Sequence, residues 1–116
     1  MVANALEAAE DLLQKNIDAT VINASTVDPI DTEMLIKTCE KARLVVTAEE
    51  ALIAGGLGGG VAECLGNSCP RPLLRIGIDN RFGESGKSAD LLEAFELTPF
   101  HIVKKILDKW NDLNPA

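Results

Sequence analysis

Residues 44–60 read LVVTAEEALIAGGLGGG, and this stretch decides the fold. It begins with a continuous apolar run over 44–48, which is typical of a strand covered on both faces in a parallel sheet. A glycine cluster over 55–60 interrupts the pattern, and glycines of this kind mark turns. Residues 61–65 then predict a short helix. The stretch therefore indicates a strand, a turn and a helix in succession.

Helices are also predicted on both sides of this stretch, because apolar residues recur there at helical spacing. The first helix opens the chain, and we expect Asn16 to end it in a left-handed conformation. The second follows Asp31, whose carboxylate can cap free amides. The last begins at Thr98 and Pro99, a cap followed by a residue suited to the first turn. The expected buried stripes are Val2, Leu6, Ala9 and Leu13, with Ala5 and Leu12 widening this first stripe, then Met34, Leu35, Cys39 and Ala42, and then Phe100, Val103, Ile106, Leu107 and Trp110.

Two further strands are expected, over 19–23 and over 73–78. Helices and strands that alternate in this way predict an α/β fold with three layers, α/β/α, around a small and mainly parallel sheet. About three strands are fewer than the roughly 5–6 of an average sheet. The chain also starts with a helix that no strand precedes, so we expect an N-terminal strand to be missing. A length of 116 residues suits one domain over 1–116.

Composition excludes several classes of function. The chain is 47% hydrophobic, 25% charged and 3% aromatic, and the first two values are ordinary for a folded protein. Its formal net charge is −7, and it has no basic stripe for the phosphates of a nucleic acid. No apolar run reaches the roughly 20 residues of a membrane span, and no secretory signal opens the chain. Cys39, Cys64 and Cys69 are then expected as reduced thiols of a cytoplasmic protein.

The glycine cluster, with Gly55, Gly56 and Gly58, has two interpretations. Free amides at a helix N-terminus could cradle a small anion such as a phosphate. The spacing, however, fits neither the G-x-G-x-x-G fingerprint nor a P-loop, which needs a Lys and a Ser or Thr. The other interpretation is a tight turn that lets the following helix pack closely on the sheet or on a partner. The sequence favours this second interpretation.

Glu49 and Glu50 lie at the expected carboxyl end of the strand over 44–48, where ligands gather in parallel sheets. They could act as a general acid/base element. Adjacent residues of an extended chain point to opposite faces, so these two cannot form one paired-carboxylate site. A salt bridge or an interface contact is the favoured role.

A polar loop carries Arg81, Phe82, Glu84 and Ser85. It could be an exposed turn, but an aromatic side chain flanked by Arg and Glu on a loop is also typical of a subunit contact. The sequence leaves both interpretations open.

His101, the only histidine, has no sequence neighbour that resembles a catalytic triad or a set of metal ligands. Cys64 and Cys69 lack the short spacing and the extra ligands of a zinc site. No nucleophile–base pair or phosphate loop is found either. We therefore expect no catalytic, cofactor-binding or metal-binding residue in this chain, and no activity from the chain alone.

Six blocks of sequence resemble the C-terminal domain of transketolase-type, thiamine-diphosphate-dependent enzymes. They run in consistent order over nearly the whole chain, and the last of them looks most like transketolase itself. Two departures stand out: Ala51 replaces a His or Gly of many relatives, and the strand and Gly-rich turn that begin the family domain are missing. The blocks are VANALEAAE (2–10), ATVIN (19–23), VDPID (27–31), VVTAEE (45–50), IAGGLG (53–58) and RIGIDNRFGESG (75–86).

The resemblance implies a Rossmann-like domain that helps to build a dimer and supports the surroundings of an active site. In this family, other domains hold thiamine diphosphate and Mg²⁺ and supply the catalytic residues. Some prokaryotes encode transketolase as separate N- and C-terminal sections. The implied partners are therefore the remaining domains or an N-terminal section, in a homodimeric or heterotetrameric assembly. The chain alone is expected to bind no cofactor.

Three hypotheses about function follow. The first is a structural domain of a transketolase, which transfers two-carbon ketol units between sugar phosphates in the pentose phosphate pathway. The second keeps this architecture but makes the parent enzyme a 1-deoxy-D-xylulose-5-phosphate synthase, whose relatives share the early blocks. The third, from another class, is a regulatory module that binds a small anion through the Gly55–Gly60 turn and the sheet edge at which the strands end.

Overall fold

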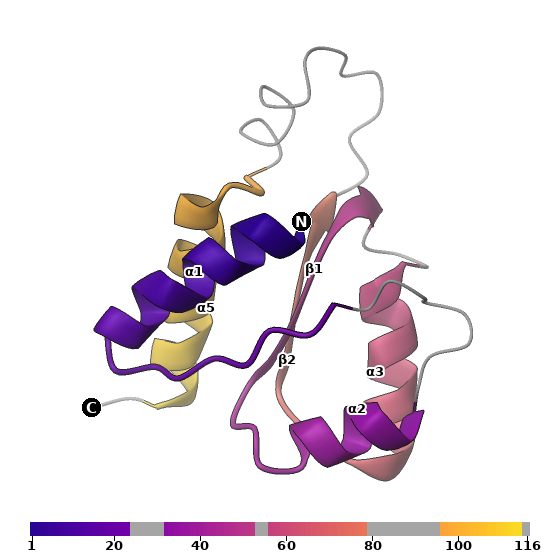
Figure 1. Ribbon diagram of the computed structural model, residues 1–116. Helices are drawn as coiled ribbons and strands as arrows, with labels where there is room; N and C mark the ends of the chain where they lie inside the picture. Colours follow the sequence, from indigo (N-terminus) through magenta and orange to yellow (C-terminus); the bar gives the residue numbers. More distant parts are fainter. Residues whose placement is uncertain (24–31, 53–55, 79–95, 115–116) are drawn as a thin grey trace.

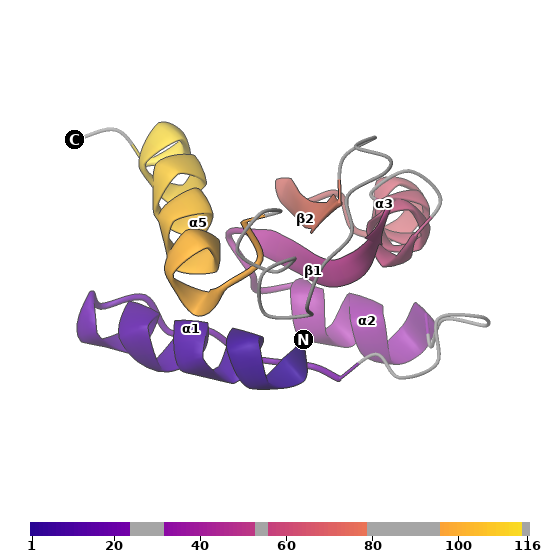
Figure 2. The ribbon, with the colours of Figure 1, turned by 90° about the horizontal axis from the view of Figure 1, so that it is seen from above.

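The computed structural model describes residues 1–23, 32–52, 56–78 and 96–114 (Figure 1). Its elements are helices and two parallel strands joined by a helix, so the α/β class predicted from the sequence is confirmed. In Figure 2 the sheet lies in the middle, with α1 and α5 on one side and α2 and α3 on the other. The elements are α1 (Val2–Gln14), α2 (Thr32–Cys39), β1 (Val45–Leu52), α3 (Leu57–Ser68), β2 (Leu73–Ile78) and α5 (Pro99–Leu113).

Within the described residues the sheet consists of β1 and β2, which run parallel. Val45 pairs with Leu73, and the register holds as far as Ala48, which pairs with Ile76. An irregularity follows between Ala48 and Leu52. Helix α3 connects the two strands as the crossover that a parallel pair requires. Both strands were predicted, and β2 has the bounds expected from its alternating pattern. Strand β1 continues to Leu52, so Glu49 and Glu50 lie within it and not after its end, as was predicted.

Two apolar cores lie on opposite faces of this sheet. Val46 and Ala48 pack against a cluster that α1 and α5 contribute to, whereas Val45 packs against a cluster from α2 and α3. This alternation follows from the period of a strand, in which successive side chains point to opposite faces. The first cluster contains Ala8, Leu12, Ile76, Leu97, Ile102, Val103 and Ile106, and the second contains Cys39, Val61, Leu65 and Cys69.

Helix α1 ends as predicted but buries a different face. Asn16 adopts φ 63°, the left-handed conformation expected at a helix end. The residues it buries fully are Ala8 and Leu12, while Val2, Leu6 and Leu13 of the expected stripe are exposed. The reason is α5, which packs along α1 and selects the face that carries Leu12. The prediction of a buried Leu6 and Leu13 was therefore wrong.

Two other helices show the same kind of difference. In α5, Thr98 and Pro99 take the predicted cap and first positions, but Phe100 is 71% exposed. The residues that α5 buries are Ile102, Val103 and Ile106, which pack in the core shared with α1 and the sheet. The prediction of a buried Phe100 was therefore wrong. In α2, Met34 is exposed, since this helix contacts its core through Leu35, Ile36 and Cys39 instead.

The strand predicted over 19–23 is not formed. Among the described residues, no backbone hydrogen bond joins 18–23 to another segment. Val21 is half-buried and Ile22 is exposed, so β propensity without a neighbouring strand does not suffice. The expected cap Asp31 lies outside the described residues. None of the helices described is long and apolar enough to cross a membrane.

Candidate functional site at the N-terminus of α3

The carboxylate of Glu49 binds the N-terminus of α3. The backbone amide of Leu57 donates to Oε1 over 3.0 Å, and that of Gly58 donates to Oε2 over 2.8 Å. The N-cap residue, Gly56, has no side chain with which to cap the helix. Glu49 therefore supplies from strand β1 the acceptor that the first turn lacks, and its negative charge faces the positive end of the helix dipole.

Gly58 brings α3 into close contact with the sheet. A Cβ atom at this position would lie 2.8 Å from Thr47 Oγ1 and 2.8 Å from Arg75 Nε. Thr47 and Arg75 are direct partners across β1 and β2. A side chain at this position would force Thr47, Arg75 or the helix to shift, so glycine suits this close approach. The close approach of α3 to the sheet agrees with the favoured interpretation of the cluster. The predicted bounds were wrong, however: α3 begins at Leu57 instead of residue 61, so Gly58 and the two glycines after it are helical.

Thr47 and Arg75 were missed by the sequence analysis. Thr47 is 5% exposed, and its hydroxyl has no hydrogen-bond partner among the described residues. Arg75 is half-buried. A signal was present, since Arg75 is the one charged residue in the otherwise apolar or glycine pattern of β2. The sequence does not reveal the register of the two strands, and it is this register that places Arg75 opposite Thr47.

Glu50 points away from this turn. Its carboxylate lies 3.6 Å from the amino group of Met1, and its side chain is half-exposed. Met1 packs against the core of α1 and α5, on the face of the sheet opposite to α3. The two adjacent glutamates therefore serve opposite faces, as their positions on an extended chain predict. They do not form a paired-carboxylate site.

His101 belongs to the first turn of α5. Its Nδ1 lies 2.7 Å from Thr98 Oγ1, and its ring makes an edge-to-face contact with Phe100. These contacts fit a histidine that helps to order the start of a helix. The candidates Gly55, Arg81, Phe82, Glu84 and Ser85 lie outside the described residues, so their predicted roles stay predictions.

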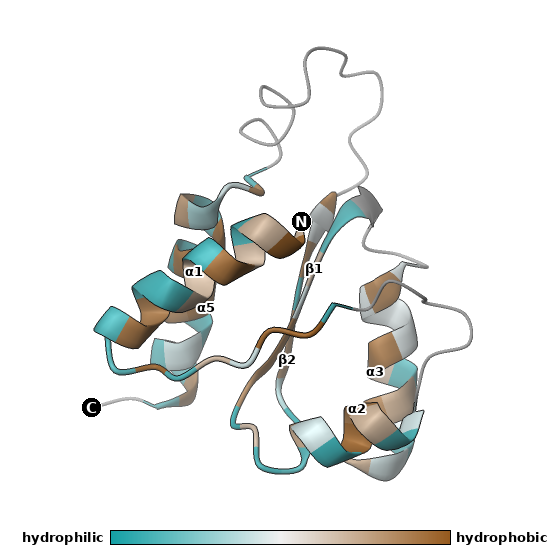
Figure 3. Ribbon diagram, viewed as in Figure 1, coloured by the Kyte–Doolittle hydropathy of each residue, from teal (hydrophilic) through white to brown (hydrophobic). Residues whose placement is uncertain are grey.

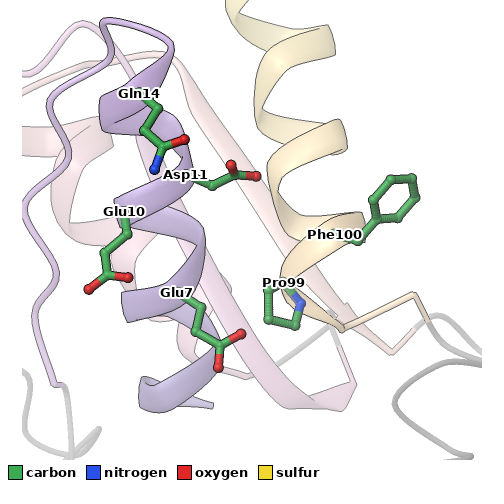
Figure 4. A pocket seen from close by; sticks show the side chains of 6 residues that line it. All are labelled: Glu7, Glu10, Asp11, Gln14, Pro99 and Phe100. Carbon is green, nitrogen blue, oxygen red and sulfur yellow. The ribbon is translucent and has the colours of Figure 1, made fainter.

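A shallow groove runs between α1 and the start of α5 (Figure 4). Glu7, Glu10 and Asp11 supply carboxylates to it, and Phe100 stands at its rim with its ring turned outward. The residues that line this groove include no pair of a nucleophile and a general base. It gives no sign of an active site.

The described residues do not fit a bound diphosphate with its metal ion. In the described ranges, no group of three or more His, Cys, Asp or Glu residues could hold a metal. The amides of Leu57 and Gly58, which could otherwise face a phosphate, are engaged by Glu49.

Replacing Glu49 by alanine should lower the free energy of unfolding by about 1–2 kcal/mol, because two amides and the helix dipole lose their acceptor. Glu49→Gln should lie between this variant and the wild type, since it keeps one acceptor oxygen and loses the charge. The neighbouring Glu50→Ala is the matched control, with an expected change within about 0.5 kcal/mol. Urea denaturation followed by circular dichroism measures all three. Equal losses for Glu49→Ala and Glu50→Ala would contradict the assigned role of Glu49.

Comparison with known proteins gives a consistent result. A family model described as "Transketolase, C-terminal domain" matches residues 1–102. A 6-deoxy-6-sulfo-D-fructose transketolase subunit of Clostridium sp. (strain MSTE9) is 49% identical over 90% of this chain and 32% of its own length. A putative transketolase C-terminal section of Methanocaldococcus jannaschii is 41% identical over 93% of this chain and 34% of its own length.

A solved structure described as "Split gene transketolase, inactive beta4 tetramer" superimposes with a TM-score of 0.83 and 38% identity. The match covers 92% of this chain and 34% of that one. A 1-deoxy-D-xylulose-5-phosphate synthase of Gloeobacter violaceus is 42% identical over 91% of this chain and 17% of its own length. The chain thus spans about a third or less of the relatives it matches. With most of its length matched by the family model, the chain belongs to the family of transketolase C-terminal domains.

Proposed function

We propose that this chain is the structural and dimerisation domain of a transketolase, and that it transfers no ketol unit by itself. The assembled enzyme moves two-carbon units between sugar phosphates in the cytoplasm, as part of the pentose phosphate pathway. Its other domains, or an N-terminal section, hold thiamine diphosphate and Mg²⁺. Thiamine diphosphate supplies the electron sink for this reaction when it is bound.

The observation that carries this proposal is the likeness to the split-gene transketolase structure. That protein is described as inactive in its β4 form, and 92% of this chain matches a third of it. Two relatives, described as a subunit and a C-terminal section, also point to enzymes divided between chains. A homodimer or a heterotetramer with an N-terminal section is the assembly that fits.

Exposed apolar side chains support the need for a partner. Leu6 and Leu13 of α1 are 51% and 60% exposed, and Phe100 is 71% exposed. Apolar, brown bands are visible along α1 in Figure 3. Leu6 and Leu13 are seven residues apart on α1 and so lie on one face of this helix, and an exposed apolar face is typical of surfaces that are covered in an assembly. The loop residues Arg81, Phe82, Glu84 and Ser85 stay candidates for a further contact.

The test is reconstitution. The purified chain alone should give no thiamine-dependent ketol transfer and no heat of binding with thiamine diphosphate in calorimetry. Addition of the missing domains, as an N-terminal section or as the full-length enzyme, should give turnover that requires both thiamine diphosphate and Mg²⁺. Micromolar binding of thiamine diphosphate by the isolated chain would overturn the proposal, and so would ketol transfer without the other domains.

A 1-deoxy-D-xylulose-5-phosphate synthase is the second candidate for the parent enzyme. Relatives of this type reach 42% identity, and the transketolase section of Methanocaldococcus jannaschii is 41% identical, so sequence identity does not separate the two. The donor separates the two candidates. Assembled enzyme should use a ketose phosphate, or 6-deoxy-6-sulfo-D-fructose as in the relative of that name, if it is a transketolase. Turnover with pyruvate instead would assign it to the synthase.

A regulatory module for small anions is the least supported of the three hypotheses. Such a module would use the amides at the N-terminus of α3, and Glu49 already binds two of them. An incoming phosphate would have to displace a carboxylate that is part of the chain. The geometry therefore favours a structural role for the glycine turn.

A further inference from the structure

Strand β1 has one edge that no other strand of the described residues pairs with. The amide of Val45 donates to the carbonyl oxygen of Pro72 over 2.9 Å, so the backbone groups of Val45 face β2. Because backbone groups alternate in direction along a strand, those of Val46 and Ala48 face away from β2. On that side, the described part of the chain offers them no backbone partner. This open edge therefore presents amides and carbonyl oxygens that another strand can bind.

The composition of β1 is that of an interior strand. Val46 and Ala48 pack against the core of α1 and α5, and Val45 packs against the core of α2 and α3. Helices thus cover both faces of this strand, as they do inside a parallel sheet. Strands that end a sheet are commonly protected by charged side chains, by proline or by a short length. Residues 45–48 read VVTA, with neither a charge nor a proline, so this edge suits a strand that is covered by a neighbour.

The segment over 18–23 lies beyond the open edge. Figure 2 shows it on the side of β1 that is opposite to β2, and in Figure 1 it crosses in front of the two strands. Residues 19–23 have the composition of a strand, yet no backbone hydrogen bond joins 18–23 to another segment among the described residues. The open edge and this segment are therefore two strand-forming stretches on the same side of the sheet, each with unpaired backbone groups.

Exposed apolar side chains are concentrated on this side of the sheet. Figure 2 shows α1, the segment over 18–23 and α2 on the side of β1 away from β2. The amino group of Met1 lies 3.6 Å from the carboxylate of Glu50, which places the start of α1 beside β1. A strand added here would bring apolar surface to side chains that now face water. Five of the seven large apolar side chains that the described residues expose belong to these elements: Val2, Leu6, Leu13, Ile22 and Met34.

We propose that the open edge of β1 binds one extended segment of polypeptide, which runs parallel to β1 and pairs on its other side with residues 19–23. The parallel direction follows that of β1 and β2, because strands with helices on both faces belong to parallel sheets. The bound segment is apolar on both faces, since an apolar core lies on each face of β1. Backbone hydrogen bonds supply the affinity of such strand addition, and the two cores select the side chains.

The segment comes from the remainder of the enzyme. The chain spans about a third or less of the relatives it matches, so most of such an enzyme lies outside these residues. This source rests on the proposed function, whereas the binding edge itself does not. Strand addition also gives residues 19–23 the neighbour that their composition requires, and it brings the sheet closer to the roughly 5–6 strands of an average sheet.

A synthetic peptide tests the open edge in the full chain. The peptide has about six residues, the usual length of a strand, with valine or isoleucine at each inner position and lysine at both ends. Hydrogen exchange at single amides is measured with and without it. The amides of Val46 and Ala48 should slow by about tenfold or more, together with alternate amides of 19–23. The amides of Val45 and Thr47, which face β2, should change little.

A second arm joins the same peptide to Met1 through a flexible linker of glycine and serine. Tethering raises its effective concentration to about the millimolar range, so weak binding of the free peptide does not hide the effect. The same amides should slow in this fusion without any added peptide. In the assembled enzyme they should also be slow, and fast exchange there would overturn the remainder of the enzyme as the source.

The matched control is a peptide with proline at two inner positions, which cannot complete a ladder and should slow no amide. Ala48→Pro removes an amide on the open edge and should abolish the slowing at Val46, with circular dichroism as the check of folding. The two peptides on the wild-type chain decide the matter if this variant does not fold. Unchanged exchange in both the peptide and the fusion arms would overturn the proposal, as would slowing confined to the outer edge of β2 or equal slowing by the proline peptide. A failed reconstitution of ketol transfer would instead contradict the proposed function and leave the result at the open edge standing.

Discussion

Replacement of Leu12 by alanine should lower the free energy of unfolding by about 2–5 kcal/mol, the range for removing a large buried side chain. Leu12 is 2% exposed and lies in the core that α1 and α5 share with the sheet. Deleting its side chain leaves a cavity, because α5 and the sheet can close around it only in part. Urea denaturation of the folded chain, followed at the helical band in circular dichroism, gives the change.

The adjacent residue provides the control. Leu13→Ala removes the same atoms from a side chain that is 60% exposed. Its expected effect is within about 0.5 kcal/mol, since little apolar area leaves a packed environment. Equal losses from the two variants would mean that α1 does not dock on α5 through the face that carries Leu12. If α1 is part of the proposed interface, Leu13→Ala should weaken the assembly more than Leu12→Ala does.

The second large effect is expected at Gly58. Gly58→Ala should lower the free energy of unfolding by about 1–3 kcal/mol, the usual cost of overpacking. The added Cβ would meet Thr47 Oγ1 and Arg75 Nε at 2.8 Å, so either the sheet pair or α3 must move. Movement of α3 would also lengthen the bonds from Glu49 to its first turn. Chemical denaturation and amide exchange at Leu57 and Gly58 measure both consequences.

Gly66 of the same helix is the matched control. A Cβ atom there would meet nothing within 4 Å. Gly66→Ala should therefore raise the free energy of unfolding by about 0.5–1 kcal/mol, because alanine is the better helix former and has fewer unfolded conformations. The same substitution is thus expected to have opposite signs at two positions of α3. A loss at Gly66 that matches the loss at Gly58 would rule out close packing as the cause.

Local patterns predicted what is decided locally. The apolar run before Glu49 gave β1, the alternation around Arg75 gave β2, and Thr98 with Pro99 gave the start of α5. Asn16 was predicted to end α1, because a left-handed residue at that point depends on its own backbone preference. Each of these features is fixed within a few residues of the chain.

Features that depend on distant segments were not predicted. Helix α1 carries leucines on more than one face, and only the position of α5 decides that Leu12 is buried and Leu13 exposed. The contact of Glu49 with the first turn of α3 spans eight and nine residues across a turn. The pair of Thr47 and Arg75 exists only through the register of the sheet. The expected strand over 19–23 had β propensity but no neighbour to pair with among the described residues.

Glu49 provides the start of α3 with an anionic acceptor that belongs to the same chain. Where nucleotide-binding folds wait for a phosphate to neutralise the amides of a helix start, this turn carries its counter-charge on the adjoining strand. A tethered group competes at an effective concentration far above that of free ions, so diffusing anions have little access to the same amides. The crossover can therefore be completed during folding regardless of which phosphate esters surround the protein. Because Glu49 occupies these amides, they are not available for the non-productive binding of a phosphorylated metabolite.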